Sequence, residues 1–158
     1  MKQLLFVLVA ITLFSCKEDS KVEEAVAKIP IEFKVERFDK IFYESKPEDL
    51  NKIKAQYPFF FSVGNPDSIW VNKLQNPLLK ELYKEVQMKY PTLGPVEADM
   101  EKMFAYVQYY FPKYKTPRVI TLISEVDTEA KAFYVDTLAL VSLDCYLGKD
   151  HRFYVDFP

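Results

Sequence analysis

Glycine, histidine and cysteine are scarce in this chain, and each shortage removes a class of functional site. The 158 residues include three glycines, one histidine and two cysteines. A phosphate-binding glycine loop needs several glycines close together, so none is expected. The single histidine, His151, excludes a zinc site built from several histidines and the two-histidine helix motif of metallopeptidases. The sequence therefore predicts no catalytic residues, no bound metal and no cofactor, and we expect no enzyme.

An excess of basic residues is also missing. The chain carries 21 Lys and Arg against 23 Asp and Glu. Residues 1–15 contain Lys2 and no acidic residue, so their removal would leave one basic side chain fewer and a formal charge of about −3. Such a chain has neither a basic field for nucleic acid nor a polybasic patch for anionic lipid.

No hydrophobic run is long enough to cross a membrane as a helix. The apolar segment at residues 4–14 follows the basic Lys2 and, as a helix, would cover only about half of the ~30 Å hydrocarbon core, so it is interpreted as the h-region of a signal peptide. Residues 13–16, with the sequence LFSC, have the form of a lipobox. We therefore predict a signal peptide over residues 1–15 and lipidation of Cys16. Two or more acyl chains such as palmitate, at about 0.8 kcal/mol per buried methylene, would make the membrane a stable partner.

A short polar segment separates this anchor from the rest of the chain. Residues 16–30 mix acids and lysines with few apolar side chains, which predicts a flexible coil holding the domain roughly 20 Å from the lipid. Lys17 after the cysteine resembles the signal of lipoproteins released to the outer membrane. The sequence KED at residues 17–19 resembles a short export signal for the cell surface, with a plain solvated linker as the alternative. Cys145 has no partner once Cys16 is acylated, and we interpret it as a buried, inert thiol.

The folded part is expected to be one α+β domain over residues 31–158. Alternating apolar residues at 31–36 predict an N-terminal strand. Proline and capping signals then mark three to four packed helices, and a small cluster of strands follows. The helices are expected near residues 47–57, 67–74, 77–90 and 95–111, and the later strands near 119–124, 133–135 and 138–143.

Aromatic residues are abundant, at 16% of the chain. We expect most of them in a single core that includes Trp70, residues 59–61 and Phe104, because large aromatic side chains contribute most when buried. The alternative is an exposed stacking platform for a sugar or a peptide.

Several short motifs, taken in order, resemble the gliding-motility lipoproteins of the GldB type. They are ERFDxxF at residues 36–42, YPFF at 57–60, Trp70, PLL at 77–79, YFP at 110–112 and LDxYLGKD at 143–150. The resemblance covers about residues 31–158 and implies a cell-envelope lipoprotein that works beside other gliding or secretion machinery proteins. It also implies a distant likeness to zinc-peptidase folds. Since such proteins are longer than this chain, the domain is expected to be incomplete at its C-terminus.

Five residues within these motifs are candidates for structural or partner-binding work: Arg37, Asp39, Asp144, Tyr146 and Gly148. Asp144 follows an apolar run that would bury it, so its carboxylate needs partners. We expect backbone amides of the following turn to supply them, with Arg37 or Arg118 as an ion partner. Gly148 suits a turn with positive φ. A turn-capping carboxylate and a partner- or ion-binding carboxylate both remain open for Asp144.

Three functions are consistent with these observations. The first is a membrane-anchored envelope component of the gliding machinery that acts through protein contacts, lipid-anchored in the outer membrane and with surface exposure left open. The second is a peptidase-like envelope hydrolase whose active half is missing here. The third is a surface lipoprotein that binds a glycan or a peptide through its aromatics.

Overall fold

The computed structural model describes residues 16–155, which form two compact units of an α+β protein. The first unit comprises the described residues up to Phe33 together with Gly94–Thr116. The second comprises Lys34–Leu93 and the residues from Pro117 onward. The α+β class is confirmed, with six α-helices and a four-stranded sheet among the described residues, rather than three to four helices. The signal peptide predicted for residues 1–15 lies outside the described residues.

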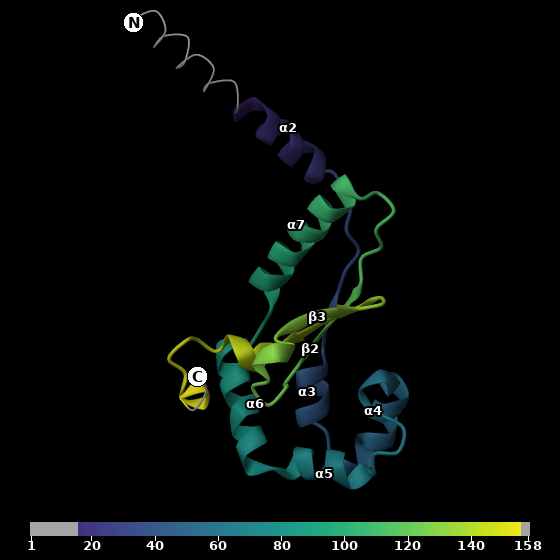
Figure 1. Ribbon diagram of the computed structural model, residues 1–158, viewed down its shortest axis with the longest axis vertical. Helices are drawn as coiled ribbons and strands as arrows, with labels where there is room; N and C mark the ends of the chain where they lie inside the picture. Colours follow the sequence, from purple (N-terminus) through teal and green to yellow (C-terminus); the bar gives the residue numbers. More distant parts are fainter. Residues whose placement is uncertain (1–15, 156–158) are drawn as a thin grey trace, which may run out of the picture. The chain divides into compact units, whose positions relative to one another are not determined.

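The first unit is a pair of helices, α2 (Cys16–Val26) and α7 (Gly94–Tyr110) (Figure 1). Val22, Val26 and Ile29 fall at helical spacing, and Val26 is buried. On α7 Phe104 is buried and packs edge-on against Phe33, with 5.4 Å between ring centroids. The prediction of a flexible coil over residues 16–30 is therefore wrong for α2, because the apolar stripe of α2 packs against α7.

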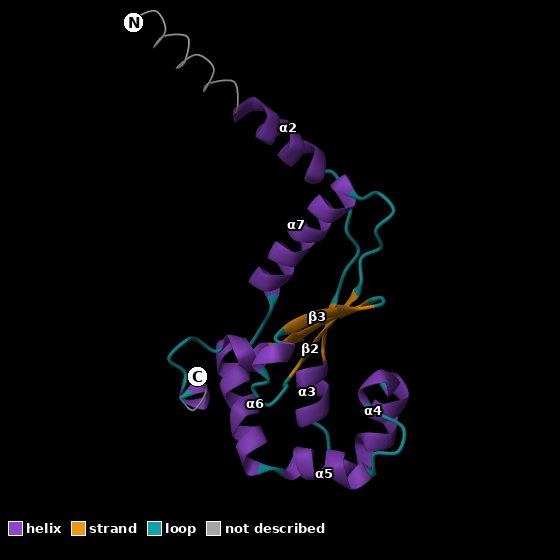
Figure 2. Cartoon of the chain, viewed as in Figure 1, coloured by secondary structure: helices purple, strands orange, loops and turns teal. Residues whose placement is uncertain are grey.

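The sheet of the second unit, whose strands are orange in Figure 2, has the strand order β1-β2-β4-β3. Its strands are β1 (Val35–Arg37), β2 (Arg118–Leu122), β3 (Ala132–Val135) and β4 (Leu138–Ser142). β2 lies parallel to both β1 and β4, with Val119 opposite Val35 and Ala139, whereas β3 runs antiparallel to β4. The N-terminal strand is shorter than predicted because Phe33 packs in the first unit and only residues from Val35 onward pair with β2.

Four helices belong to the second unit. They are α3 (Phe38–Tyr43), α4 (Leu50–Gln56), α5 (Asp67–Gln75) and α6 (Pro77–Lys89). Asn76 caps α6, accepting hydrogen bonds from the backbone N–H groups of Leu78 and Leu79, and Pro77 occupies its first turn. The sequence predicted three of these helices and missed α3, which continues directly from β1 (Figure 1).

Aromatic and aliphatic side chains from α3, α4, α5, the segment between α4 and α5, and the sheet make the core of the second unit. Its buried members are Phe38, Phe42, Leu50, Ile53, Tyr57, Phe61, Leu74, Ile120 and Leu140. Phe60 and Trp70 pack against this core and are partly buried, while Phe59 is exposed. Phe104, expected in the same core, is instead buried in the first unit. No helix within residues 16–155 has the length and apolar character needed to cross a membrane.

Candidate functional site

A polar residue lies at the carboxyl end of each of the three parallel strands, and the sequence singled out two of the three, Asp39 and Asp144. Asp39 follows β1, Ser124 follows β2 and Asp144 follows β4. In sheets with parallel strands, ligands bind in the crevice outside the carboxyl ends. The parallel pairing thus makes this edge of the sheet the candidate functional site.

Asp39 is a buried carboxylate, and both of its oxygens accept hydrogen bonds from other side chains. Its oxygens accept from Arg37 Nε at 2.9 Å and Arg37 Nη2 at 2.7 Å, from Gln87 Nε2 at 3.0 Å and from the Thr121 hydroxyl. Arg37 also donates through Nη1 to the backbone carbonyl of Tyr90. We call Arg37, Asp39, Gln87 and Thr121 the Asp39 cluster. These hydrogen bonds tie β1, β2 and α6 together.

Asp144 is fully buried and caps the turn that follows β2. Its carboxylate accepts from the backbone N–H of Ser124 at 3.1 Å and of Val126 at 2.6 Å, with the Ser124 hydroxyl nearby. Burial raises the pKa of the Asp144 carboxyl, and the hydrogen bonds from these backbone groups oppose that rise. The turn-capping interpretation of Asp144 fits this geometry.

The partners of Asp144 differ from those predicted. The donors come from the turn at residues 124–126, which precedes Asp144 by many residues, and not from the turn that follows it. Glu125 and Val126 adopt positive φ angles of 65° and 62° in this turn, in which the N–H groups of Ser124 and Val126 both point to the carboxylate. Neither expected arginine is an ion partner, because Arg37 binds Asp39 and Arg118 binds Glu36.

Tyr146 and Gly148 shape the loop after Asp144. Gly148 has a φ of 125°, so the predicted positive-φ turn is confirmed. The Tyr146 ring is exposed, while its backbone carbonyl accepts a hydrogen bond from the Tyr90 hydroxyl at 2.6 Å. Because Arg37 binds the Tyr90 carbonyl, Tyr90 joins the Asp39 cluster to this loop.

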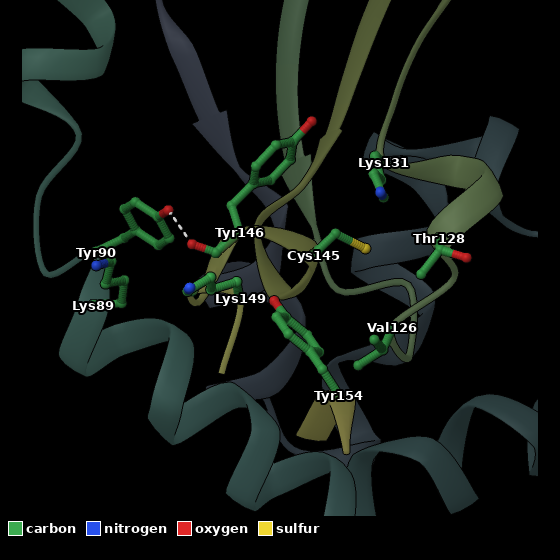
Figure 3. Close-up of a pocket in the computed structure, with 10 residues that line it drawn as sticks. Lys89, Tyr90, Val126, Thr128, Lys131, Cys145, Tyr146, Lys149 and Tyr154 are labelled. Carbon is green, nitrogen blue, oxygen red and sulfur yellow. Dashed lines mark hydrogen bonds between the residues drawn. The ribbon is translucent and has the colours of Figure 1, made fainter. Parts of the chain in front are cut away.

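An open pocket of about 640 Å³ lies beside this loop, and we call it the Tyr154 pocket (Figure 3). The Tyr154 hydroxyl donates to the backbone carbonyl of Asp144 at 2.5 Å and accepts from the backbone N–H of Leu147 at 2.8 Å. These two bonds fix the ring as one wall. The rest of the lining includes Tyr90, Val126, Thr128, Cys145, Tyr146 and Gly148.

Three lysines complete the lining of the Tyr154 pocket: Lys89 at the end of α6, Lys131 before β3, and Lys149 after Gly148. All three are exposed. Lys149 lies 4.0 Å from the exposed carboxylate of Asp150. Within residues 16–155, no salt bridge joins Lys89 or Lys131 to an acid.

The lining of this pocket includes one thiol, that of Cys145. Cys145 is half-buried, and burial raises the pKa of its thiol, which donates to the backbone carbonyl of Asp127 at 3.3 Å. A raised pKa makes the thiolate scarce, as expected for an inert cysteine. His151 is engaged elsewhere, with its Nε2 atom 3.4 Å from Glu85 on α6. The pocket lining therefore pairs no nucleophile with an imidazole base.

The expected likeness to zinc-peptidase folds finds no support. In the described part of the chain, no three histidine, cysteine, aspartate or glutamate side chains are grouped so as to hold a metal ion. The Asp39 carboxylate accepts hydrogen bonds from Arg37, Gln87 and Thr121, and the Asp144 carboxylate accepts them from the backbone N–H groups of Ser124 and Val126, so neither offers a free carboxylate for a metal.

The structure thus brings all five candidate residues to one edge of the sheet. Sequence reasoning missed the pocket lysines together with Tyr90 and Tyr154. They come from separate parts of the chain: the end of α6, the segment before β3 and the segment after β4. Of these residues only Lys149 falls within a motif that the sequence singled out, at residues 143–150.

Comparison with known proteins gives one match. A family model described as gliding motility protein GldB matches residues 19–158. No curated protein and no solved structure matches the chain.

Proposed function

This chain belongs to the family of gliding motility protein GldB, and we propose on that basis that it is a lipid-anchored part of the gliding machinery that acts through contacts with other proteins. The family supports a gliding motility lipoprotein of the cell envelope. We propose in addition which residue is acylated, to which membrane it is anchored and which surface contacts other proteins.

The anchor is Cys16, at the end of the lipobox. Ser15 is the small residue that allows cleavage before an acylated cysteine, and Lys17 supports transfer to the outer membrane. Replacing Cys16 by Ala should abolish acylation and move the protein out of the detergent phase on phase partitioning. Cys145→Ala is the matched control, because that thiol lies inside the folded unit and should leave both properties unchanged. A Cys16→Ala protein that is still acylated and membrane-bound would contradict the assignment.

The proposed contact surface rests on one observation, the exposed edge strand β3. Phe133, Tyr134 and Val135 are 40%, 54% and 49% exposed, and all four residues of the strand are accessible on both faces. β3 pairs only with β4, so its outer edge leaves backbone N–H and C=O groups without a strand partner. Edge strands of this kind are usually protected by charges, proline or bulges, and β3 has none of these within its four residues.

We assign to this edge an extended segment of another envelope protein, which would add a strand next to β3. Strand addition gains affinity from main-chain hydrogen bonds and specificity from alternate side chains. Phe133 and Val135 would contact the added strand on one face of the sheet, and Tyr134 on the other.

The test is the double substitution Phe133→Ser and Tyr134→Ser in a gliding strain that lacks the native gene. Because both side chains are about half exposed, the variant should stay folded and anchored, yet gliding and crosslinking to neighbouring envelope proteins should be lost. Phe111→Ser is the control, since Phe111 is 66% exposed but lies in the first unit. Normal gliding by the β3 variant would refute contact through this edge.

A further inference from the structure

The Tyr154 pocket combines positive charge with fixed aromatic walls. Lys89, Lys131 and Lys149 line it, and no aspartate or glutamate of the described chain does. This local excess contrasts with the net negative charge of the whole protein. A concave site lined by one sign of charge attracts ligands of the opposite sign.

The three lysines reach the pocket from two sides. Figure 3 shows Lys89 and Lys149 together near Tyr90, with Lys131 across the pocket beyond Cys145. Their ammonium groups form no strong ion pair with an acidic side chain of the described chain. The contact of Lys149 with Asp150 is 4.0 Å long, and both side chains are about 90% exposed. Exposed pairs of this kind contribute little and are screened by salt.

Two other acids are sequence neighbours of lining residues, and both already accept hydrogen bonds: Asp144 precedes Cys145, and Asp127 lies between Val126 and Thr128. Asp144 is covered by the backbone N–H groups of Ser124 and Val126 and does not line the pocket. Asp127 is exposed, and its carboxylate accepts from the backbone N–H of Glu129. Neither acid is salt-bridged to Lys131.

From this arrangement we propose that the Tyr154 pocket binds a phosphate-bearing ligand, held by Lys89, Lys131 and Lys149 against the rings of Tyr146 and Tyr154. Phosphate carries up to two charges on several oxygens and can engage lysines from more than one direction, whereas a single carboxylate satisfies fewer of them. The tyrosine rings offer flat surfaces for the part of the ligand that carries the phosphate. The phosphate could belong to a soluble molecule or to a lipid headgroup, and the experiment separates the two.

Cys145 gives a reporter inside the pocket, because its half-buried thiol is part of the lining. The full chain carrying Cys16→Ala has one thiol left, and its alkylation by a neutral maleimide can be timed with and without pyrophosphate. We expect pyrophosphate to slow alkylation saturably, and added salt to weaken that protection. The double substitution Lys89→Ala and Lys131→Ala should raise the concentration for half-protection by about tenfold or more.

Lys80→Ala is the matched control, since Lys80 lies on the same helix α6 but outside the pocket. It should leave protection unchanged. Sedimentation with phosphatidylglycerol vesicles, compared with phosphatidylcholine vesicles, identifies the source of the phosphate. Protection by pyrophosphate without vesicle binding indicates a soluble ligand, and vesicle binding lost in the double variant indicates a headgroup. The proposal is overturned if neither protection by pyrophosphate nor vesicle binding is seen. It is also overturned if protection is equal in the double variant and in the Lys80→Ala control.

Discussion

The negative charge of Asp39 is neutralised by one guanidinium group, that of Arg37. Its side chain is fully buried, and Arg37 is only 16% exposed. Arg37→Met keeps most of the apolar volume but leaves the carboxylate buried without a cation, which should lower the free energy of unfolding by about 3–5 kcal/mol. Urea denaturation measures the loss.

Arg118→Met provides the comparison, because Arg118 also binds a carboxylate with two nitrogens but is 48% exposed. Its loss should cost less than about 1 kcal/mol. Equal losses for the two arginine variants would show that the Asp39 cluster is no more desolvated than the surface pair.

Asp144 should make stability depend on pH in a defined direction. Because burial raises the pKa of its carboxyl above the value in the unfolded chain, the folded chain binds this proton more tightly. The stability gained from protonation is complete below the unfolded pKa and is lost as pH rises through the folded pKa. Asp144→Asn removes this titration and leaves an amide N–H₂ facing backbone donors.

We therefore expect Asp144→Asn to lose about 1–3 kcal/mol near neutral pH. The gap between wild type and variant should widen as pH falls toward the unfolded pKa of the carboxyl. Unfolding by urea at a series of pH values measures both quantities. Asp127→Asn, at an exposed carboxylate, should show no such widening. A gap that narrows in acid would mean that hydrogen bonding, and not burial, dominates the pKa of Asp144.

At the scale of elements, the loop after Asp144 depends on the backbone freedom of Gly148. Its φ of 125° is one that side chains disfavour, although a Cβ would meet nothing within 4 Å. Gly148→Ala should therefore destabilise the protein by about 1–3 kcal/mol through backbone strain alone.

Gly94→Ala is the same chemical change at the first residue of α7, where φ is not in the left-handed region and space is also open. It should be neutral or slightly stabilising. Thermal unfolding of the two variants compares them directly, and similar shifts in Tm would argue against strain at Gly148.

Most elements could be predicted from local signals. Asn76-Pro77 marked the start of α6. The strands predicted near 133–135 and 138–143 correspond to β3 and β4, which are joined by a turn at Asp136 with a φ of 53°. The predictions were wrong for segments whose structure depends on packing with residues far away in the sequence. α2 is helical because its apolar stripe packs on α7, and β1 is short because Phe33 packs on Phe104.

The candidate site was predictable as a set of residues but not as an arrangement. Asp144 was expected to be buried with backbone partners, and it is. Its donors at residues 124–126 could not be found, because they depend on β2 pairing in parallel with β4. Sequence patterns report which face of a strand is apolar, but they do not report which strand lies beside it.

At the scale of the whole molecule, the two units have separate packing. Phe104 is buried in the first unit with Phe33 and Tyr114, and Ile120 lies in the core of the second. Phe104→Ala should remove about 3–5 kcal/mol of packing from the first unit. Hydrogen exchange should then accelerate mainly at the amides of α2 and α7.

Exchange at the amides of β2 serves as the internal reference, because these amides lie in the second unit. Their protection should change much less. Equal acceleration in both units would mean that the chain unfolds as one cooperative body despite its separate packing.

The order of the sheet also has a mechanical consequence. If Cys16 is anchored in lipid, tension carried along the backbone from the anchor first reaches the second unit at Lys34, at the amino end of β1. If a partner strand pairs with β3, the tension leaves at the opposite edge, after crossing β2 and β4. The ladder bonds of β1, the Glu36–Arg118 pair and the Asp39 cluster would then carry the load together at the entry edge. The small sheet would act as a coupling that transmits force from an anchored strand to a docked one.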